Sequence, residues 1–195
     1  MRSVSTLPEG YREYYSIDLQ KDKKAAIAVN VIALIIAAIM VVPMCFAVPI
    51  SPLFDMSDGI GIYFLRLAAL ILLIVLYMLL HELVHGAAMK LCGTKRVKYG
   101  FTGMYAFAGS EDYYGKGAYI FIALAPIVLL GAAIAVVNFL IPTSSPWFWI
   151  VYFIQVNNVS GAAGDLFVTF RFARFPSDIL VRDHGVGMCV YSRFE

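Results

Sequence analysis

One stretch of the sequence decides the fold, residues 60–91, which run IGIYFLRLAALILLIVLYMLLHELVHGAAMKL. Nearly all of these side chains are apolar, and about 20 apolar residues in a helix are enough to cross the ~30 Å core of a bilayer. Lipid offers no hydrogen-bond partner to a free backbone amide, so such a segment has to be helical. We therefore predict a transmembrane helix here, which carries the ionisable side chains His81, Glu82 and His85 within five residues.

Three more apolar stretches accompany this one, at residues 25–48, 118–141 and 147–170. The chain of 195 residues is 61% hydrophobic and only 14% charged, and its mean hydropathy is +0.79. Soluble domains are typically ~45–50% hydrophobic and ~25% charged. This composition leaves too little polar surface for a soluble domain and excludes disorder. The sequence predicts an all-α protein of the lipid bilayer, with four transmembrane helices.

The loop between the second and third predicted spans differs in composition. Residues 99–117 are rich in glycine, tyrosine and phenylalanine, which favours strands and turns over helix. We predict a short β-hairpin-like segment here, which either only joins two helices or offers residues 104–108 to an extended peptide by strand addition.

The predicted organisation has three parts. They are an N-terminal segment (residues 1–24), a four-helix transmembrane domain (residues 25–170, with its core at residues 60–170) and a C-terminal tail (residues 171–195).

The basic residues gather on one side of the predicted spans. Fourteen of the 15 Lys and Arg lie in residues 1–24, 90–116 and 171–193. Because basic loops stay on the cytoplasmic side, we predict a multi-pass protein with both termini in the cytoplasm. The exception, Arg66, can reach outward or meet Asp58. A net charge of +2, with no basic stretch interleaved with aromatics, argues against a nucleic-acid partner.

The spacing of the two histidines in residues 60–91 points to a metal. Positions four apart lie on one face of a helix, so His81 and His85 can bind one zinc ion. The Glu82 carboxylate, beside the first histidine, can then accept a proton from the attacking water. A satisfied polar pair in a helix bundle is the alternative. Because a charged side chain at mid-span costs about 2.5–3.5 kcal/mol, three ionisable groups within five residues favour the metal site.

Catalytic zinc usually takes three protein ligands. Asp165 is the better candidate for the third ligand, because Asp165 and Glu82 are the two acidic residues inside the predicted spans. His184, by contrast, lies in the tail. At 1.5 Å per residue, His85 lies ~7.5 Å and Asp165 ~9 Å from the inner ends of their spans. The two residues therefore have matching depth near the cytoplasmic face. Three cysteines without a CxxC pair argue against a cysteine-ligated metal.

Two side-chain amides precede Asp165 by about two helical turns, those of Asn157 and Asn158. Either amide can donate to a developing oxyanion, and either can instead form an interhelical hydrogen bond. Both possibilities stay open at the level of sequence.

His81-Glu82-Leu83-Val84-His85 in one predicted span, followed two spans later by an Asn-rich helix with Asp165, resembles the intramembrane zinc metalloproteases of the site-2 protease clan. More narrowly, residues 60–170 are similar to the zincin peptidase family related to that clan. The clan's third ligand is the Asp of an Asn-x-x-Pro…Asp-Gly motif, eight residues after the Asn. Asn157 and Asp165 keep that spacing, but Ser160 stands in place of the Pro and Leu166 in place of the Gly.

The resemblance implies specific roles. His81, His85 and Asp165 would be zinc ligands, Glu82 the general base and Asn157 an oxyanion helper. It also implies that residues 99–117 form a membrane-associated sheet whose edge receives an extended substrate.

We therefore expect a zinc metallopeptidase that hydrolyses peptide bonds of a membrane protein or peptide, in or beside the membrane and near its cytoplasmic face. The alternative is a non-proteolytic regulatory or binding protein with a structural or silent zinc site, for which a closed shell of four ligands would speak. The sequence leaves the oligomeric state open.

Overall fold

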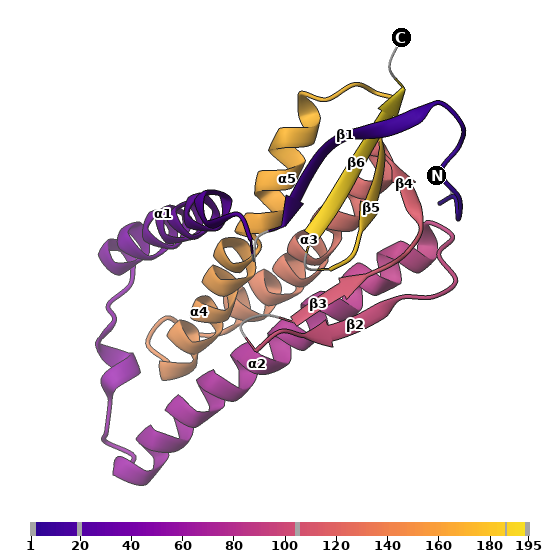
Figure 1. Cartoon of the computed structure of the whole chain (residues 1–195). Helices are drawn as coiled ribbons and strands as arrows, with labels where there is room; N and C mark the ends of the chain where they lie inside the picture. Colours follow the sequence, from indigo (N-terminus) through magenta and orange to yellow (C-terminus); the bar gives the residue numbers. More distant parts are fainter. Residues whose placement is uncertain (1–2, 19–20, 104–105, 186, 194–195) are drawn as a thin grey trace. The chain divides into compact units, whose positions relative to one another are not determined.

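Three long helices form where the sequence predicts the first three spans, as the computed structural model of the chain shows (Figure 1). They are α1 (Lys23–Ala47), α2 (Ile60–Leu91) and α3 (Lys116–Leu140). The structure describes residues 3–18, 21–103, 106–185 and 187–193, and within these ranges the same three helices are long and apolar enough to cross a membrane. The predictions of a mostly helical chain and of a membrane protein agree with this finding.

The fourth predicted span is not one helix. Residues 147–170 are divided between α4 (Pro146–Gly161) and α5 (Ala163–Ala173), with the break at Ala162. The break falls in the run Gly161-Ala162-Ala163-Gly164, and glycine is about 1 kcal/mol less favourable than alanine inside a helix. Only 16 residues long, α4 is shorter than the ~20 residues that a bilayer core requires. The expectation of one continuous helix over residues 147–170 is therefore wrong, and a fourth transmembrane helix is not confirmed.

Strands also form outside the predicted hairpin, so the all-α prediction is too narrow. Four strands pair antiparallel in the order β1-β6-β5-β4. Their bounds are Tyr11–Asp18 for β1, Gly187–Arg193 for β6, Leu180–Asp183 for β5 and Tyr113–Gly115 for β4. Figure 1 shows β1, from the N-terminal segment, alongside β6, from the C-terminal tail.

The predicted hairpin between the second and third helices is present. It consists of β2 (Lys98–Phe101) and β3 (Ala106–Gly109), paired from Lys98 opposite Gly109 to Phe101 opposite Ala106. Met104 and Tyr105, the first residues of the segment proposed to bind an extended peptide, lie outside the described residues.

The chain divides into two compact units, each with its own core. The first unit comprises Met1–Val29, Leu80–Pro126 and Gly164–Glu195. Its core is apolar and includes the buried side chains Met89, Tyr114, Ile122, Phe172, Val181 and Val190. This core supports the C-terminal part of α2, where the two histidines lie.

The second unit comprises Asn30–Leu79 and Ile127–Ala163. Aromatic residues of α4 fill its core, and two of them donate hydrogen bonds to backbone carbonyls. The Trp149 indole donates to Pro49 at 2.8 Å, and the Tyr152 hydroxyl donates to Met40 at 2.8 Å. In the same unit Arg66 forms an ion pair with Asp58, one of the two outcomes expected for this residue.

The end of α2 has a sequence-encoded stop. Gly93 adopts a φ of +102°, which glycine tolerates best. Its amide donates to Lys90 at 2.9 Å, and the Thr94 amide donates to Met89 at 3.2 Å. These two bonds make a Schellman motif, which satisfies the last carbonyls of the helix. The α2 helix therefore ends at Leu91, six residues beyond His85, and Gly93 stops it.

Candidate metal centre

The two histidines of α2 face each other across one helical turn. The Nε2 atoms of His81 and His85 lie 3.1 Å apart, and the two rings meet edge to face with their centroids 4.7 Å apart. Each residue is 9% exposed. The spacing of four residues brings both imidazoles to the same face, as predicted from the sequence.

The third candidate ligand comes from α5. Asp165 lies in the first turn of this helix, where the positive end of the helix dipole favours a carboxylate. Its Oδ2 atom is 3.3 Å from Nε2 of His81 and 3.5 Å from Nε2 of His85. Among the described residues, these three side chains are the group that can hold a metal ion, with ligand atoms within 4.8 Å of one another.

The distances fit a zinc ion. Zinc binds imidazole nitrogen and carboxylate oxygen at about 2.0–2.2 Å, so two ligands of a tetrahedral site lie ~3.4 Å apart. The three separations here are 3.1, 3.3 and 3.5 Å. The donor set of two imidazoles and one carboxylate is also one that catalytic zinc uses.

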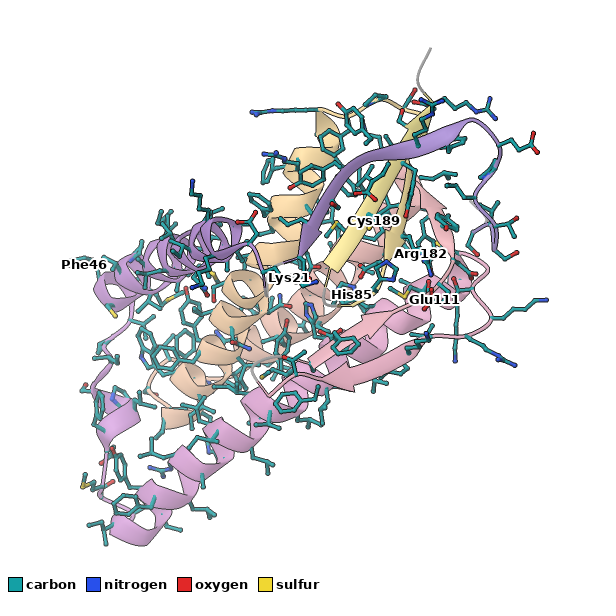
Figure 2. All side chains as sticks on the ribbon, in the orientation of Figure 1. Lys21, Phe46, His85, Glu111, Arg182 and Cys189 are labelled. Carbon is teal, nitrogen blue, oxygen red and sulfur yellow. The ribbon has the colours of Figure 1, made fainter. Side chains whose placement is uncertain are left out.

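A backbone contact fixes the orientation of the second imidazole. Nδ1 of His85 lies 2.9 Å from the carbonyl oxygen of Ile122 in α3, and Figure 2 labels the His85 side chain. A carbonyl only accepts, so Nδ1 carries the proton in this contact. In the neutral ring the Nε2 atom then has a free lone pair, and that atom faces His81 and Asp165.

The carboxylate next to the first histidine lies against the hairpin. Glu82 is half-buried, and the backbone amide of Ala108 in β3 donates a hydrogen bond to it. The hairpin also approaches α2 at Gly86, where a Cβ would overlap the Tyr99 ring. A glycine directly after His85 therefore lets the hairpin lie close to the histidine-bearing turn.

Asp183, in the C-terminal tail, places a carboxylate near the metal cluster. The sequence alone assigns no role to this residue. The Asp183 carboxylate in β5 accepts hydrogen bonds from the Tyr119 hydroxyl and, at 2.7 Å, from the Gly185 amide. Burial raises the pKa of this carboxyl despite both donors, and the group interacts electrostatically with His85 and Asp165. Because β5 reaches this position only through long-range strand pairing, no local sequence signal identifies Asp183.

His184, the residue after Asp183, is not part of the metal cluster. His184, considered as a third ligand, is exposed and is absent from the group of potential metal ligands within the described ranges. Glu111 and Arg182, labelled in Figure 2, form an ion pair on the surface of the same unit.

The two amides proposed as oxyanion donors have different surroundings. Asn158 is fully buried in the second unit, where its Oδ1 accepts from the Tyr77 hydroxyl at 3.0 Å and its Nδ2 donates to Ile127 at 3.2 Å. Both ends of this side chain are engaged in hydrogen bonds that connect helices α2, α3 and α4. Asn157 is half-buried and stays the predicted oxyanion donor.

We predict that zinc affinity depends on the three clustered side chains and not on the tail histidine. Replacing His81 with Ala, or Asp165 with Asn, removes one of three ligands, so the dissociation constant should rise by more than the ~10–100-fold typical of losing a group that only supports a ligand. His184→Ala is the matched control among the three histidines and should bind zinc like the wild type. Competition with a chromophoric chelator measures all three. Equal loss in His184→Ala would contradict the assignment.

Comparison with known proteins supports a metallopeptidase. The sequence profile of a family described as "Putative zincin peptidase" matches residues 71–180, more than half of the chain. An uncharacterized 24.7 kDa protein of Pyrococcus woesei is 32% identical over 124 residues, which are 61% of this chain and 53% of that protein. The alignment thus spans about half the length of this relative, and no solved structure matches significantly. The family match includes the whole clustered site, and the chain belongs to this zincin peptidase family.

Proposed function

We propose that the protein is a zinc-dependent peptidase, similar to the site-2 protease clan, that hydrolyses peptide bonds in or beside the membrane near its cytoplasmic face. The observation that carries this proposal is the meeting of His81, His85 and Asp165, with ligand atoms within 4.8 Å. The Glu82 carboxylate follows the first of these residues directly in the same helix. Membership of a zincin peptidase family supports zinc as the metal.

The charges of the site support a bound cation. Glu82 and Asp165 interact electrostatically with each other and with the two histidines. The negative charge of two carboxylates is costly away from bulk water unless a positive charge lies beside them. When bound, a zinc ion would offset this charge, polarise the scissile carbonyl and lower the pKa of the attacking water toward ~7.

Glu82 has the position of a general base. It accepts the proton of the attacking water and then delivers it to the amine nitrogen of the leaving peptide. The Ala108 amide donates to the carboxylate and holds it on the hairpin side of α2. His81 and His85 hold the metal from the same helix, so base and ligands keep a fixed relation.

The hairpin is the proposed platform for the substrate. A peptide has to be extended to expose its carbonyl, and an extended peptide can add to the edge of a sheet. The contact between Ala108 and Glu82 turns the edge of β3 that does not face β2 toward the catalytic carboxylate. This contact favours strand addition over a hairpin that only joins two helices.

The alternative of a structural or silent zinc site has less support. A structural site closes its coordination with four protein ligands, whereas a catalytic site keeps one position open. The cluster found in the described ranges has three members, and His184 is exposed. Three protein ligands leave one coordination position of zinc open, which favours a catalytic site.

The proposed side of the membrane follows from charge. The histidine pair lies near the C-terminal end of α2, which is followed by Lys95, Arg96 and Lys98. Basic segments favour the cytoplasmic face, so the site lies near that face with both chain termini in the cytoplasm. A membrane protein or membrane-bound peptide is the substrate class that can reach it.

We predict that Glu82→Gln abolishes proteolysis and keeps zinc. An amide cannot accept the proton, so turnover should fall by about 10²–10⁴-fold. The measurement compares membrane proteomes of cells that express wild type, Glu82→Gln or the control Glu111→Gln, whose carboxylate lies in the exposed pair with Arg182. New peptide termini near the cytoplasmic leaflet should occur with wild type and Glu111→Gln only. Unchanged fragments with Glu82→Gln, at equal zinc content, would refute the proposed role.

We predict different effects for the two neighbouring asparagines, one on catalysis and the other on stability. Asn157→Ala should lower kcat by about 10²–10³-fold, as loss of an oxyanion donor does, without changing stability or zinc content. Asn158→Ala removes two buried hydrogen bonds and should lower the free energy of unfolding by about 1–3 kcal/mol. Chemical unfolding in detergent and cleavage of a substrate found by the proteome comparison measure both. Normal kcat in Asn157→Ala would remove this residue from the mechanism.

A further inference from the structure

A proline lies inside helix α3, four residues after the carbonyl that His85 contacts. In a regular α-helix the carbonyl of residue i accepts from the amide of residue i+4. For Ile122 that amide would belong to residue 126, which is Pro126 and has no N–H. The usual helical donor to the Ile122 carbonyl therefore does not exist.

The imidazole of His85 takes the place of this donor. Its Nδ1 atom lies 2.9 Å from the Ile122 oxygen, and both residues are buried. Donation from Nδ1 leaves the lone pair of the neutral ring on Nε2. That Nε2 atom lies 3.1 Å from Nε2 of His81 and 3.5 Å from Oδ2 of Asp165, so the lone pair is directed into the cluster of candidate ligands.

We propose that Pro126 is a positioning residue for the metal centre, because its missing N–H reserves the Ile122 carbonyl for His85. The carbonyl in turn selects the tautomer of His85 that can ligate a metal through Nε2. This inference rests on the proposed zinc site, but it concerns a state of the chain that exists without metal. A hydrogen bond to the far nitrogen of a ligating histidine commonly fixes its ring and raises its basicity.

A second proline offers an internal comparison. Pro43 lies inside α1 and likewise deprives a carbonyl of its helical donor. Helix α1 provides none of the three residues of the metal cluster. Proline is the residue least favourable inside a helix, so exchange for alanine should preserve either helix.

The test uses the full chain in lipid nanodiscs, with three forms of position 126. These are wild type, Pro126→Ala, and a backbone ester in which lactic acid replaces residue 126. The last two forms have the same side chain, but only Pro126→Ala has an N–H. Pro43→Ala is the control for proline loss in a helix, and circular dichroism verifies the helical content of each form.

The first readout is the tautomer of His85 without metal. The chain has three histidines, so His184→Gln and His85→Gln spectra assign their ¹⁵N resonances. At a pH where the spectra show neutral rings, wild type, the ester form and Pro43→Ala should have a protonated Nδ1 on His85. Pro126→Ala should show a mixture with the Nε2-protonated tautomer. An unchanged tautomer in Pro126→Ala would overturn the proposal.

The second readout is the affinity for Zn²⁺ itself, measured by competition with a chelator. Pro126→Ala should bind about 10–100-fold more weakly than wild type, the effect expected for a group that supports a ligand. The ester form should recover most of this loss, and Pro43→Ala should equal wild type. Failure of the ester to differ from Pro126→Ala would overturn the role of the missing N–H. A chain that binds zinc and responds in this way but cleaves no peptide would refute only the proposed peptidase activity.

Discussion

The structure depends on keeping three polar donor atoms together in a chain that is mostly apolar. Two of them come from one turn of α2, and the third comes from α5, 80 residues later in the sequence. Their separations of 3.1–3.5 Å are close to the ~3.4 Å between two ligands of a tetrahedral zinc ion. Bringing two imidazoles and a carboxylate this near without a cation would leave them poorly solvated. A bound metal ion, as proposed above, would give the three donor atoms a common partner.

The predictable parts of this protein are the local ones. The histidine pair follows from a spacing of four residues, and three long helices follow from the lengths of apolar sequence. Exclusion of other ligands and the matching depth predict Asp165, and the structure places it beside both histidines. The break at Ala162 has a local signal in the nearby glycines, Gly161 and Gly164. The continuous apolar sequence around them nevertheless favours the prediction of one helix.

The unpredicted parts depend on long-range pairing and on the backbone. Strand β1 finds its partner β6 at the other end of the chain, and no periodicity within either segment specifies that partner. Asp183 reaches the neighbourhood of the site through the same sheet. The Ile122 carbonyl has no side-chain signature, although Pro126 inside a predicted span marks a carbonyl four residues earlier as free to bind something else. Interior prolines of apolar helices are thus a usable signal for such contacts.

The central claim is that one zinc ion is bound by two imidazoles and one carboxylate. X-ray absorption at the zinc edge of the purified, zinc-loaded protein tests it most directly, because nitrogen and oxygen ligands differ from sulfur in distance and scattering. The account predicts nitrogen and oxygen neighbours at about 2.0–2.2 Å, with the multiple scattering of two imidazole rings. A sulfur neighbour at about 2.3 Å would place the metal on a cysteine, and a shell without imidazole scattering would place it away from His81 and His85. Either result would contradict the account.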